Sequence, residues 1–167
     1  MGIVERDFDN GDIHPIDIVE SLAEERAWDF DRIADDQIAM AIEGTWRTYS
    51  VTLAYSEREE VLRLICAFEF APPAKRLARV YETMALANDR CWSGAFVLWP
   101  DQKLMAYRYS LNLVGGAQVG HGQVKDIVRA AVAAAERFYP AFQLVAWGGE
   151  APGKALGIAM AEAYGRA

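Results

Sequence analysis

Two neighbouring segments with strict two-residue alternation constrain the fold of this sequence most. The segment WRTYSVTLAY covers residues 46–55, and EVLRLICAFEF covers residues 60–70. Alternation of apolar and polar side chains is typical of a β-strand with one buried face. The four residues SERE between the segments suit a short turn, so the pair predicts an antiparallel hairpin. The positions expected to share the buried face are Tyr49, Val51, Leu53, Tyr55, Leu62, Leu64, Cys66, Phe68 and Phe70.

Three further segments predict strands. QIAMAIEG at 37–44 alternates and ends at a glycine, and GAFVLWP at 94–100 is apolar throughout. KLMAYRYSLNL at 103–113 alternates again, after a short PDQ turn. Together with the hairpin, these segments predict a five-stranded antiparallel sheet.

Helical spacing of apolar residues marks three helices. They are expected near residues 14–28, at about 74–88, and from about Gln123 onwards. Pro140 is expected to break or kink the third helix, with one or two further turns before Gly148. The order α-β-β-β-α-β-β-α predicts an α+β, two-layer domain with the helices on one face of the sheet.

The length of 167 residues suits one domain. We expect a flexible N-terminal arm at 1–13, a single domain at 14–149, and a C-terminal tail at 150–167 that can be helical. The arm is acidic and has no apolar stretch typical of a signal peptide. The expected location is therefore the cytoplasm, with no membrane span.

Charge and cysteine content exclude several functions. The chain has 17 Lys and Arg against 24 Asp and Glu, for a net charge of −7, and the cations are scattered. Binding to nucleic acid or to anionic lipid needs clustered cations, so neither is expected, and a basic or apolar partner fits better. Cys66 and Cys91 lie in apolar surroundings and are expected to be reduced, structural residues.

The glycine-rich segment GGAQVGHG, residues 115–122, lies between a strand and a helix, as a phosphate-binding loop does. Gly115 and Gly120 match the outer glycines of that motif, but His121 and Gly122 replace its Lys and Ser/Thr. We therefore interpret this segment as a connection rather than a nucleotide site. A small ligand-binding domain or enzyme that uses the Gly115–Gly122 loop and His121 remains the alternative function.

Four aspartates gather in DFDRIADDQ, residues 29–37, namely Asp29, Asp31, Asp35 and Asp36. An EF-hand loop would need an oxygen ligand at Ile33 and a glycine at Ala34. A solvated acidic turn is the better interpretation.

The rest of the sequence predicts no catalytic residues, no metal ligands and no cofactor. Only His14 and His121 are available as imidazoles, and neither has a cysteine nearby in sequence. The serines lie outside any nucleophile motif. We therefore expect a protein that is not an enzyme.

Aromatic residues are the candidate contact residues. Large aromatic side chains more often belong to the core, but the supply here is generous for one helix–sheet domain. A surplus can form an exposed patch for self-association or for a partner. The candidates for partner-binding or dimer contacts are Trp99, Tyr139, Phe142 and Trp147.

Two segments, NDRCWSGAFVLWPDQKLMAYRYSLNL at 88–113 and RFYPAFQLVAWGGEAPGKAL at 137–156, resemble the YbjN-like family of bacterial proteins, in its alphaproteobacterial branch. The resemblance extends from about His14 to Leu156. Its most specific parts are Asn88, Gly94, Phe96, Trp99 and the YPAF…WGG segment at 139–149.

This resemblance implies a regulator of sensory transduction with a fold similar to type III secretion chaperones. Those chaperones are small acidic α+β proteins that form dimers and hold extended segments of a partner. The family implies no catalytic residues. The leading hypothesis is a non-enzymatic regulatory or chaperone-like module, forming a homodimer and binding a protein or peptide through a helix–sheet groove or a sheet edge.

Overall fold

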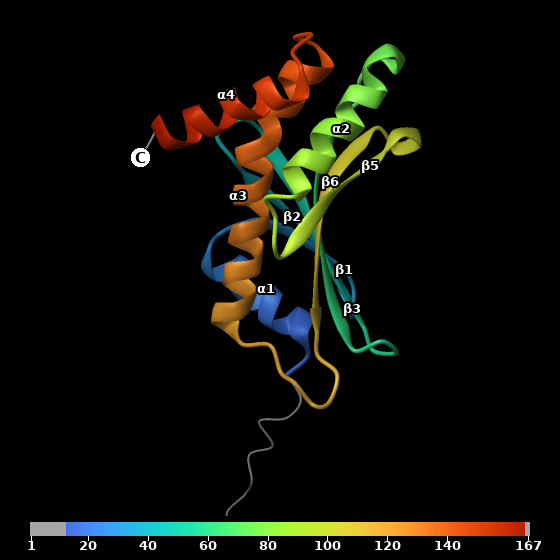
Figure 1. Cartoon of the computed structure of the whole chain (residues 1–167). Helices are drawn as coiled ribbons and strands as arrows, with labels where there is room; N and C mark the ends of the chain where they lie inside the picture. The colour runs from blue at the N-terminus through green and yellow to red at the C-terminus, as the bar shows by residue number, and fades with distance from the viewer. Residues whose placement is uncertain (1–12, 166–167) are drawn as a thin grey trace, which may run out of the picture.

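The computed structural model describes residues 13–165, with side chains through Ala161. It consists of a six-stranded antiparallel sheet with four α-helices on one side (Figure 1). The strand order is β1-β2-β3-β4-β6-β5. In chain order the elements are α1 (Pro15–Glu25), β1 (Asp29–Ala34), β2 (Gln37–Glu43), β3 (Thr48–Ser56), β4 (Val61–Glu69), η1 (Ala74–Arg76), α2 (Leu77–Asn88), β5 (Gly94–Trp99), η2 (Pro100–Gln102), β6 (Leu104–Asn112), α3 (His121–Ala146) and α4 (Pro152–Gly165).

The α+β class and the antiparallel sheet confirm the sequence-based prediction, but the predicted number of strands and order of elements are wrong. The sheet has six strands, because β1 precedes the first strand that the sequence predicts. Asp29 and Asp31 lie on this strand and face solvent, while only Asp35 and Asp36 form the turn into β2. An edge strand with a polar outer side shows little apolar alternation, and the aspartates therefore resembled a loop.

Arg32 is the residue that attaches this edge strand to the helical side. Its guanidinium forms ion pairs with Asp17 at 2.7 Å and Glu20 at 2.8 Å, both on α1. These carboxylates raise the pKa of Arg32, chiefly through the hydrogen bond that its guanidinium donates to Asp17. Arg32 of β1 therefore pairs with α1, while Asp29 and Asp31 stay exposed and only Asp35 and Asp36 belong to a solvated turn.

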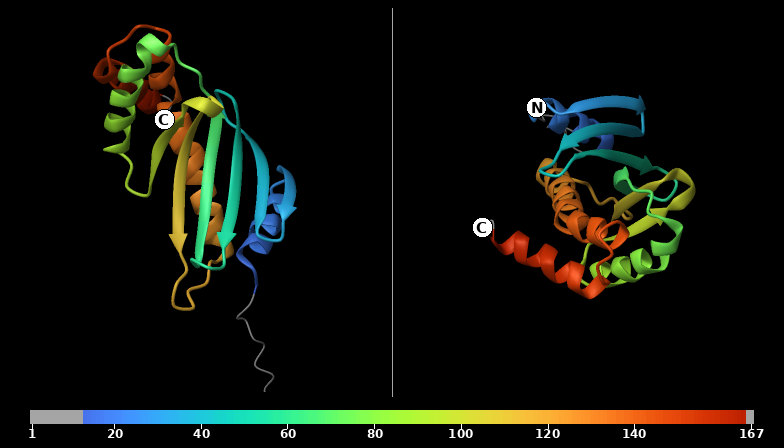
Figure 2. Two further views of the ribbon diagram at one scale, coloured as in Figure 1. Left: turned by 90° about the vertical axis from the view of Figure 1, so that its right-hand side faces the viewer. Right: turned by 90° about the horizontal axis from the view of Figure 1, so that it is seen from above.

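The alternating segments place their apolar side chains as predicted. Tyr49, Val51 and Leu53 of β3 are buried, and so are the predicted inward residues of β4. They pack against α1 and α3, which lie on the same side of the sheet. Seen from above, the sheet curls around α3 (Figure 2, right), so this helix lies at the centre of the core.

The predicted break of the third helix at Pro140 is wrong, because α3 runs through it from His121 to Ala146, whereas the further turns predicted before Gly148 are present. A proline inside a helix costs about 3 kcal/mol. The residues that follow include Phe142 and Val145, both fully buried. Burying two such side chains stabilises by about 1.5–3 kcal/mol each, which together offsets the cost of the proline.

Arg76 holds the end of α3 in place. Its guanidinium donates to the carbonyl of Val145 at 2.8 Å and to that of Glu150 at 3.0 Å. A cation at these carbonyls compensates the unpaired acceptors of a helix C-terminus. The chain then turns into α4, whose Ala155, Leu156, Ala159 and Met160 are buried. The predicted C-terminal tail is thus a helix that packs on α3.

The N-terminal arm predicted at 1–13 lies, except for Ile13, outside the described residues. Within residues 13–165, none of the helices combines the length and apolarity that crossing a bilayer requires.

The outer edge of β5 is paired by a side chain. Asn88, the last residue of α2, accepts from the N–H of Phe96 at 2.6 Å and donates to its C=O at 3.1 Å. Both backbone groups of Phe96 are therefore satisfied without a further strand. Close packing next to this position also explains Gly94, because a Cβ there would clash with Tyr107 and the Arg108 carbonyl.

Replacing Asn88 with alanine is expected to lower the free energy of unfolding by about 2 kcal/mol, because it leaves a buried donor and acceptor of Phe96 unpaired. The shift of the urea denaturation midpoint, at an unchanged m-value, measures this loss of stability. Asp89→Ala, at the exposed next residue, is the matched control and should shift the midpoint little. Equal effects of the two substitutions would show that the Asn88 amide does not stabilise β5.

Candidate functional site

The sheet has one face that none of the helices described between residues 13 and 165 covers. Figure 2 (left) looks onto this open face, with α1 and α3 behind the strands. At its centre lie small side chains, with Ala67 of β4 opposite Ala106 of β6. Antiparallel sheets commonly leave one face to solvent, where it is polar. This face has apolar and aromatic residues beside its polar ones, which is typical of a contact surface.

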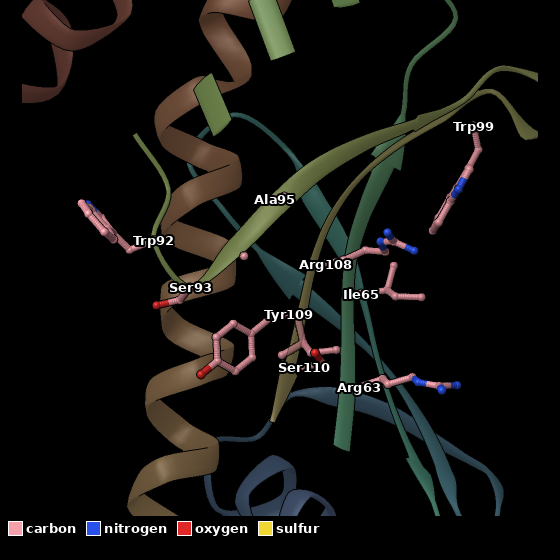
Figure 3. A pocket seen from close by; sticks show the side chains of 11 residues that line it. Arg63, Ile65, Trp92, Ser93, Ala95, Trp99, Arg108, Tyr109 and Ser110 are labelled. Atoms are coloured by element: carbon pink, nitrogen blue, oxygen red, sulfur yellow. The ribbon is translucent and has the colours of Figure 1, made fainter. Parts of the chain in front are cut away.

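A pocket of about 770 Å³ lies on the open face where β4, β6 and β5 meet (Figure 3). We call it the open-face pocket. Its lining residues are Arg63, Leu64, Ile65, Trp92, Ser93, Gly94, Ala95, Trp99, Arg108, Tyr109 and Ser110.

Strand register brings the central residues of this pocket together. Ile65 of β4 is directly opposite Arg108 of β6, which is in turn opposite Ala95 of β5. Trp99 ends β5 just before Pro100, and in Figure 3 its ring extends from above towards Arg108. The figure shows the side chains of Ile65, Arg108 and Trp99 on the side of the sheet away from α3.

Two arginines supply the charge of the open-face pocket. Arg63 forms an ion pair with Glu59, and both side chains are about half exposed. Arg108 is exposed and takes part in no ion pair within residues 13–165. A free guanidinium beside an indole and an isoleucine can bind a carboxylate or carbonyl next to an apolar group.

The chemistry of the pocket suits binding. Its hydroxyls belong to Ser93, Ser110 and Tyr109, and none of its lining residues is a histidine or a carboxylic acid. An activated nucleophile needs an adjacent base. Over the part of the chain that the structure describes, no three His, Cys, Asp or Glu side chains group as metal ligands do.

The four predicted contact residues are not brought together. Trp99 lies in the open-face pocket, whereas the other three lie on the helical side. Phe142 is fully buried between Phe70 and Phe96, at ring distances of 6.1 and 5.1 Å. Phe142 therefore has no exposed surface with which to contact a partner.

Tyr139 and Trp147 lie near the C-terminal end of α3 and are partly accessible to solvent. Tyr139 packs edge-on against Phe68 at 5.2 Å and is half-buried. Trp147 is 52% exposed and meets Phe70 with one edge, also at 5.2 Å. It lies over a shallow depression with Pro73 and Arg76, on the side opposite the open face.

The glycine-rich loop has the features of a connection. Gly115 and Gly116 adopt positive φ angles of 80° and 78°, which favour glycine. His121 is the first residue of α3, and its Nε2 lies 3.2 Å from a carboxylate oxygen of Glu25 at the end of α1. The loop residues and His121 are exposed, except Val119, and they do not belong to the open-face pocket.

The two cysteines are free thiols that are poorly suited to reaction. Cys66 is buried within the sheet, and burial raises its pKa to about 12. Cys91 is half-buried, and burial raises its pKa as well. Because the thiolate is the reactive form, neither residue is activated at neutral pH.

Sequence reasoning missed most of the open-face pocket. Arg63, Ile65 and Arg108 occupy the outward positions of strands whose inward positions were identified correctly. The available signal was an isoleucine at an outward position, where a solvated sheet face would favour a polar residue. Trp92, which was not among the predicted contact residues, is 99% exposed at one end of the pocket.

Comparison with known proteins agrees with the fold. The family model YbjN, described as "Putative bacterial sensory transduction regulator", matches residues 15–144. Among solved structures, the "Crystal structure of YbjN, a putative transcription regulator from E. coli" matches with a TM-score of 0.53 and 10% identity, over 73% of this chain and 87% of that chain. Curated protein sequences give no match. The family match covers most of the chain, which therefore belongs to the YbjN family.

Proposed function

We propose that this protein is a non-enzymatic regulatory module that binds a protein partner through the open-face pocket. The observation that carries the proposal is the group formed by Trp99, Ile65 and Arg108 on an uncovered sheet face. Tryptophan and arginine dominate binding energy at protein interfaces. The family description as a sensory transduction regulator is consistent with such a role.

The pocket also indicates which kind of segment fits. An apolar side chain of the partner would lie against Trp99 and Ile65, while a carboxylate or main-chain carbonyl would accept from Arg108. An extended segment can lie along the strands and present alternate side chains to this face. This is a chaperone-like use of the sheet face. The β5 edge is less suited to adding a strand, because Asn88 already pairs with Phe96.

Direct contact with DNA fits this chain less well, although the structurally similar E. coli protein is described as "a putative transcription regulator". DNA-binding surfaces neutralise phosphates with clustered Lys and Arg. This chain has a net charge of −7, and the open-face pocket contains only two cationic side chains. Any influence on transcription would therefore act through a bound protein.

Affinity capture with point variants tests the proposal. Tagged full-length chain is used with lysate of the source organism, and bound proteins are quantified by mass spectrometry. We expect a recurrent, stoichiometric partner whose recovery falls about 10-fold or more with Trp99→Ala and with Arg108→Glu, as for interface hot spots. Tyr81→Ala, at an exposed aromatic of α2, is the matched control and should retain the partner.

Light scattering of the same variants separates this proposal from self-association. A homodimer through the open face would dissociate with Arg108→Glu, and one through the Trp147 region would not. Capture that Trp99→Ala and Arg108→Glu leave unchanged, with folding intact, would reject the open-face pocket as the binding site.

A further inference from the structure

A second pocket lies on the opposite side of the sheet, between the end of α1 and α3. Its volume is about 250 Å³. The two helices run side by side here, next to the end of β2 (Figure 1). The lining residues are Arg26, Trp28, Ile42, Lys125, Val128, Arg129, Val132 and Ala133.

The interior of this pocket is apolar. Ile42 and Val128 are buried, and Trp28 and Val132 are partly buried and packed against the core. Such walls offer water few of the two to four polar partners that it needs, although the pocket opens to the surface at Arg26, Arg129 and Ala133. A cavity of about 150 Å³ with apolar walls already admits benzene. The volume here therefore suits a slightly larger hydrocarbon group.

Three basic residues are among those that line this pocket, which they contact mainly with their aliphatic stems. Arg26 follows α1, and Lys125 and Arg129 are one turn apart on α3. Within residues 13–165, none of the three belongs to an ion pair. Like charges at i and i+4 destabilise a helix, and an anion between them relieves the repulsion.

The neighbouring carboxylates do not neutralise these cations. Glu25, next to Arg26 in sequence, pairs with His121. Asp126 follows Lys125 directly, so it projects from another side of α3. In a chain with a net charge of −7, three basic residues at one pocket, without an ion pair among the described residues, are a specific local feature.

We propose that this pocket binds a small anionic amphiphile, namely a medium-chain carboxylate. The hydrocarbon chain lies against Trp28, Ile42 and Val128, and the carboxylate lies at the rim between Arg26 and Arg129. Apolar burial supplies affinity, and the cations select against neutral or cationic molecules with the same chain. The site is separate from the open-face pocket, so it does not depend on the protein-binding proposal.

Fluorescence quenching with a brominated decanoate, below its critical micelle concentration, tests this site on the full chain. Bromine quenches a tryptophan that it contacts, so we expect saturable quenching that Trp28→Phe abolishes and Trp99→Phe retains. The double variant Arg26→Ala/Arg129→Ala should weaken binding about 10-fold or more, as expected for loss of charge-assisted contacts. Arg58→Ala, at an exposed arginine in the β3–β4 turn, should leave binding unchanged.

Two further measurements distinguish a built site from general adsorption. Ala133→Phe keeps all three cations but fills the pocket, and it should abolish saturable quenching. Decanol and decyltrimethylammonium should compete at least about 10-fold more weakly than decanoate, because they lack the anion. The proposal is overturned by quenching that persists in Trp28→Phe, by equal competition from the cationic amphiphile, or by the absence of saturation in the wild type.

Discussion

Replacing Phe142 with alanine is expected to lower the free energy of unfolding by about 4 kcal/mol, the typical cost of truncating a buried phenylalanine. The ring is fully buried and meets Phe70 and Phe96 edge-on. These two residues come from the end of β4 and from β5, so Phe142 connects α3 to two distant parts of the sheet. The surrounding side chains are themselves buried and cannot collapse fully into the cavity.

Chemical denaturation monitored by circular dichroism measures this loss, and Trp147→Ala is the comparison on the same helix end. Trp147 is 52% exposed and touches Phe70 with one edge, so its truncation should cost only about 1 kcal/mol. Equal losses of stability from Phe142→Ala and Trp147→Ala would contradict this packing. A Phe142→Ala variant as stable as wild type would show that α3 does not continue through Pro140.

The contrast between Phe142 and Trp147 shows how far the sequence specifies the fold. Two-residue alternation identified the inward faces of β3 and β4, because the apolar or polar character of each residue there agrees with the face on which it lies. Pro140 was misleading, because the helix continues only when the residues after the proline are buried against distant parts of the chain. Similarly, β1 was missed because Arg32 pairs with Asp17 and Glu20 across a helix–strand contact that no local pattern encodes.

The two pockets were harder to predict from the sequence than the fold. The open-face pocket depends on the register that places Ile65 opposite Arg108, and this register follows from a strand order in which β6 lies next to β4. The second pocket joins Arg26 to Arg129, about a hundred residues later. Of the four predicted contacts, only Trp99 reached a pocket of the open face, since aromatic character alone does not distinguish core from surface.

The second large effect is expected at Glu136, on α3. Its carboxylate accepts from the hydroxyl of Tyr49 at 2.6 Å and from the N–H groups of Thr45 and Trp46 at 2.8 and 3.2 Å. One side chain therefore fixes the β2–β3 turn and the start of β3 to the central helix. The turn approaches so closely that a Cβ at Gly44 would collide with this carboxylate.

Replacing Glu136 with alanine should lower the free energy of unfolding by about 3 kcal/mol. The two N–H groups lie in an exposed turn, where water replaces the carboxylate, but the Tyr49 hydroxyl loses a charge-assisted bond inside the fold. Glu136→Gln keeps an acceptor and should cost about 1 kcal/mol. Denaturant midpoints of the three proteins measure the series, and Gly44→Ala should also destabilise by displacing the carboxylate.

Tyr49 provides an independent test of the same contact. Burial, and next the hydrogen bond and charge of Glu136, raise the pKa of Tyr49 above its ordinary value of 10.0. Below pH 10 the phenol is neutral in both folded and unfolded chains, so its contribution to stability is complete there. Above pH 10 the unfolded chain releases this proton while the folded chain keeps it, so stability falls by up to about 1.36 kcal/mol per pH unit.

Tyr49→Phe should remove the Tyr49 part of this alkaline loss and leave the part that the buried Cys66 thiol causes. In a double-mutant cycle Tyr49→Phe and Glu136→Ala should couple by about 1–2 kcal/mol. The loss of stability at alkaline pH arises mainly from the burial of the Tyr49 hydroxyl, so part of it should persist in Glu136→Ala. The coupling energy between the two substitutions, in contrast, reports on the hydrogen bond alone. Additive substitutions with an unchanged alkaline slope would mean that Glu136 does not hold Tyr49 in solution. The helix would then be fixed to the sheet by apolar packing only, and Phe142→Ala would be the single large effect along α3.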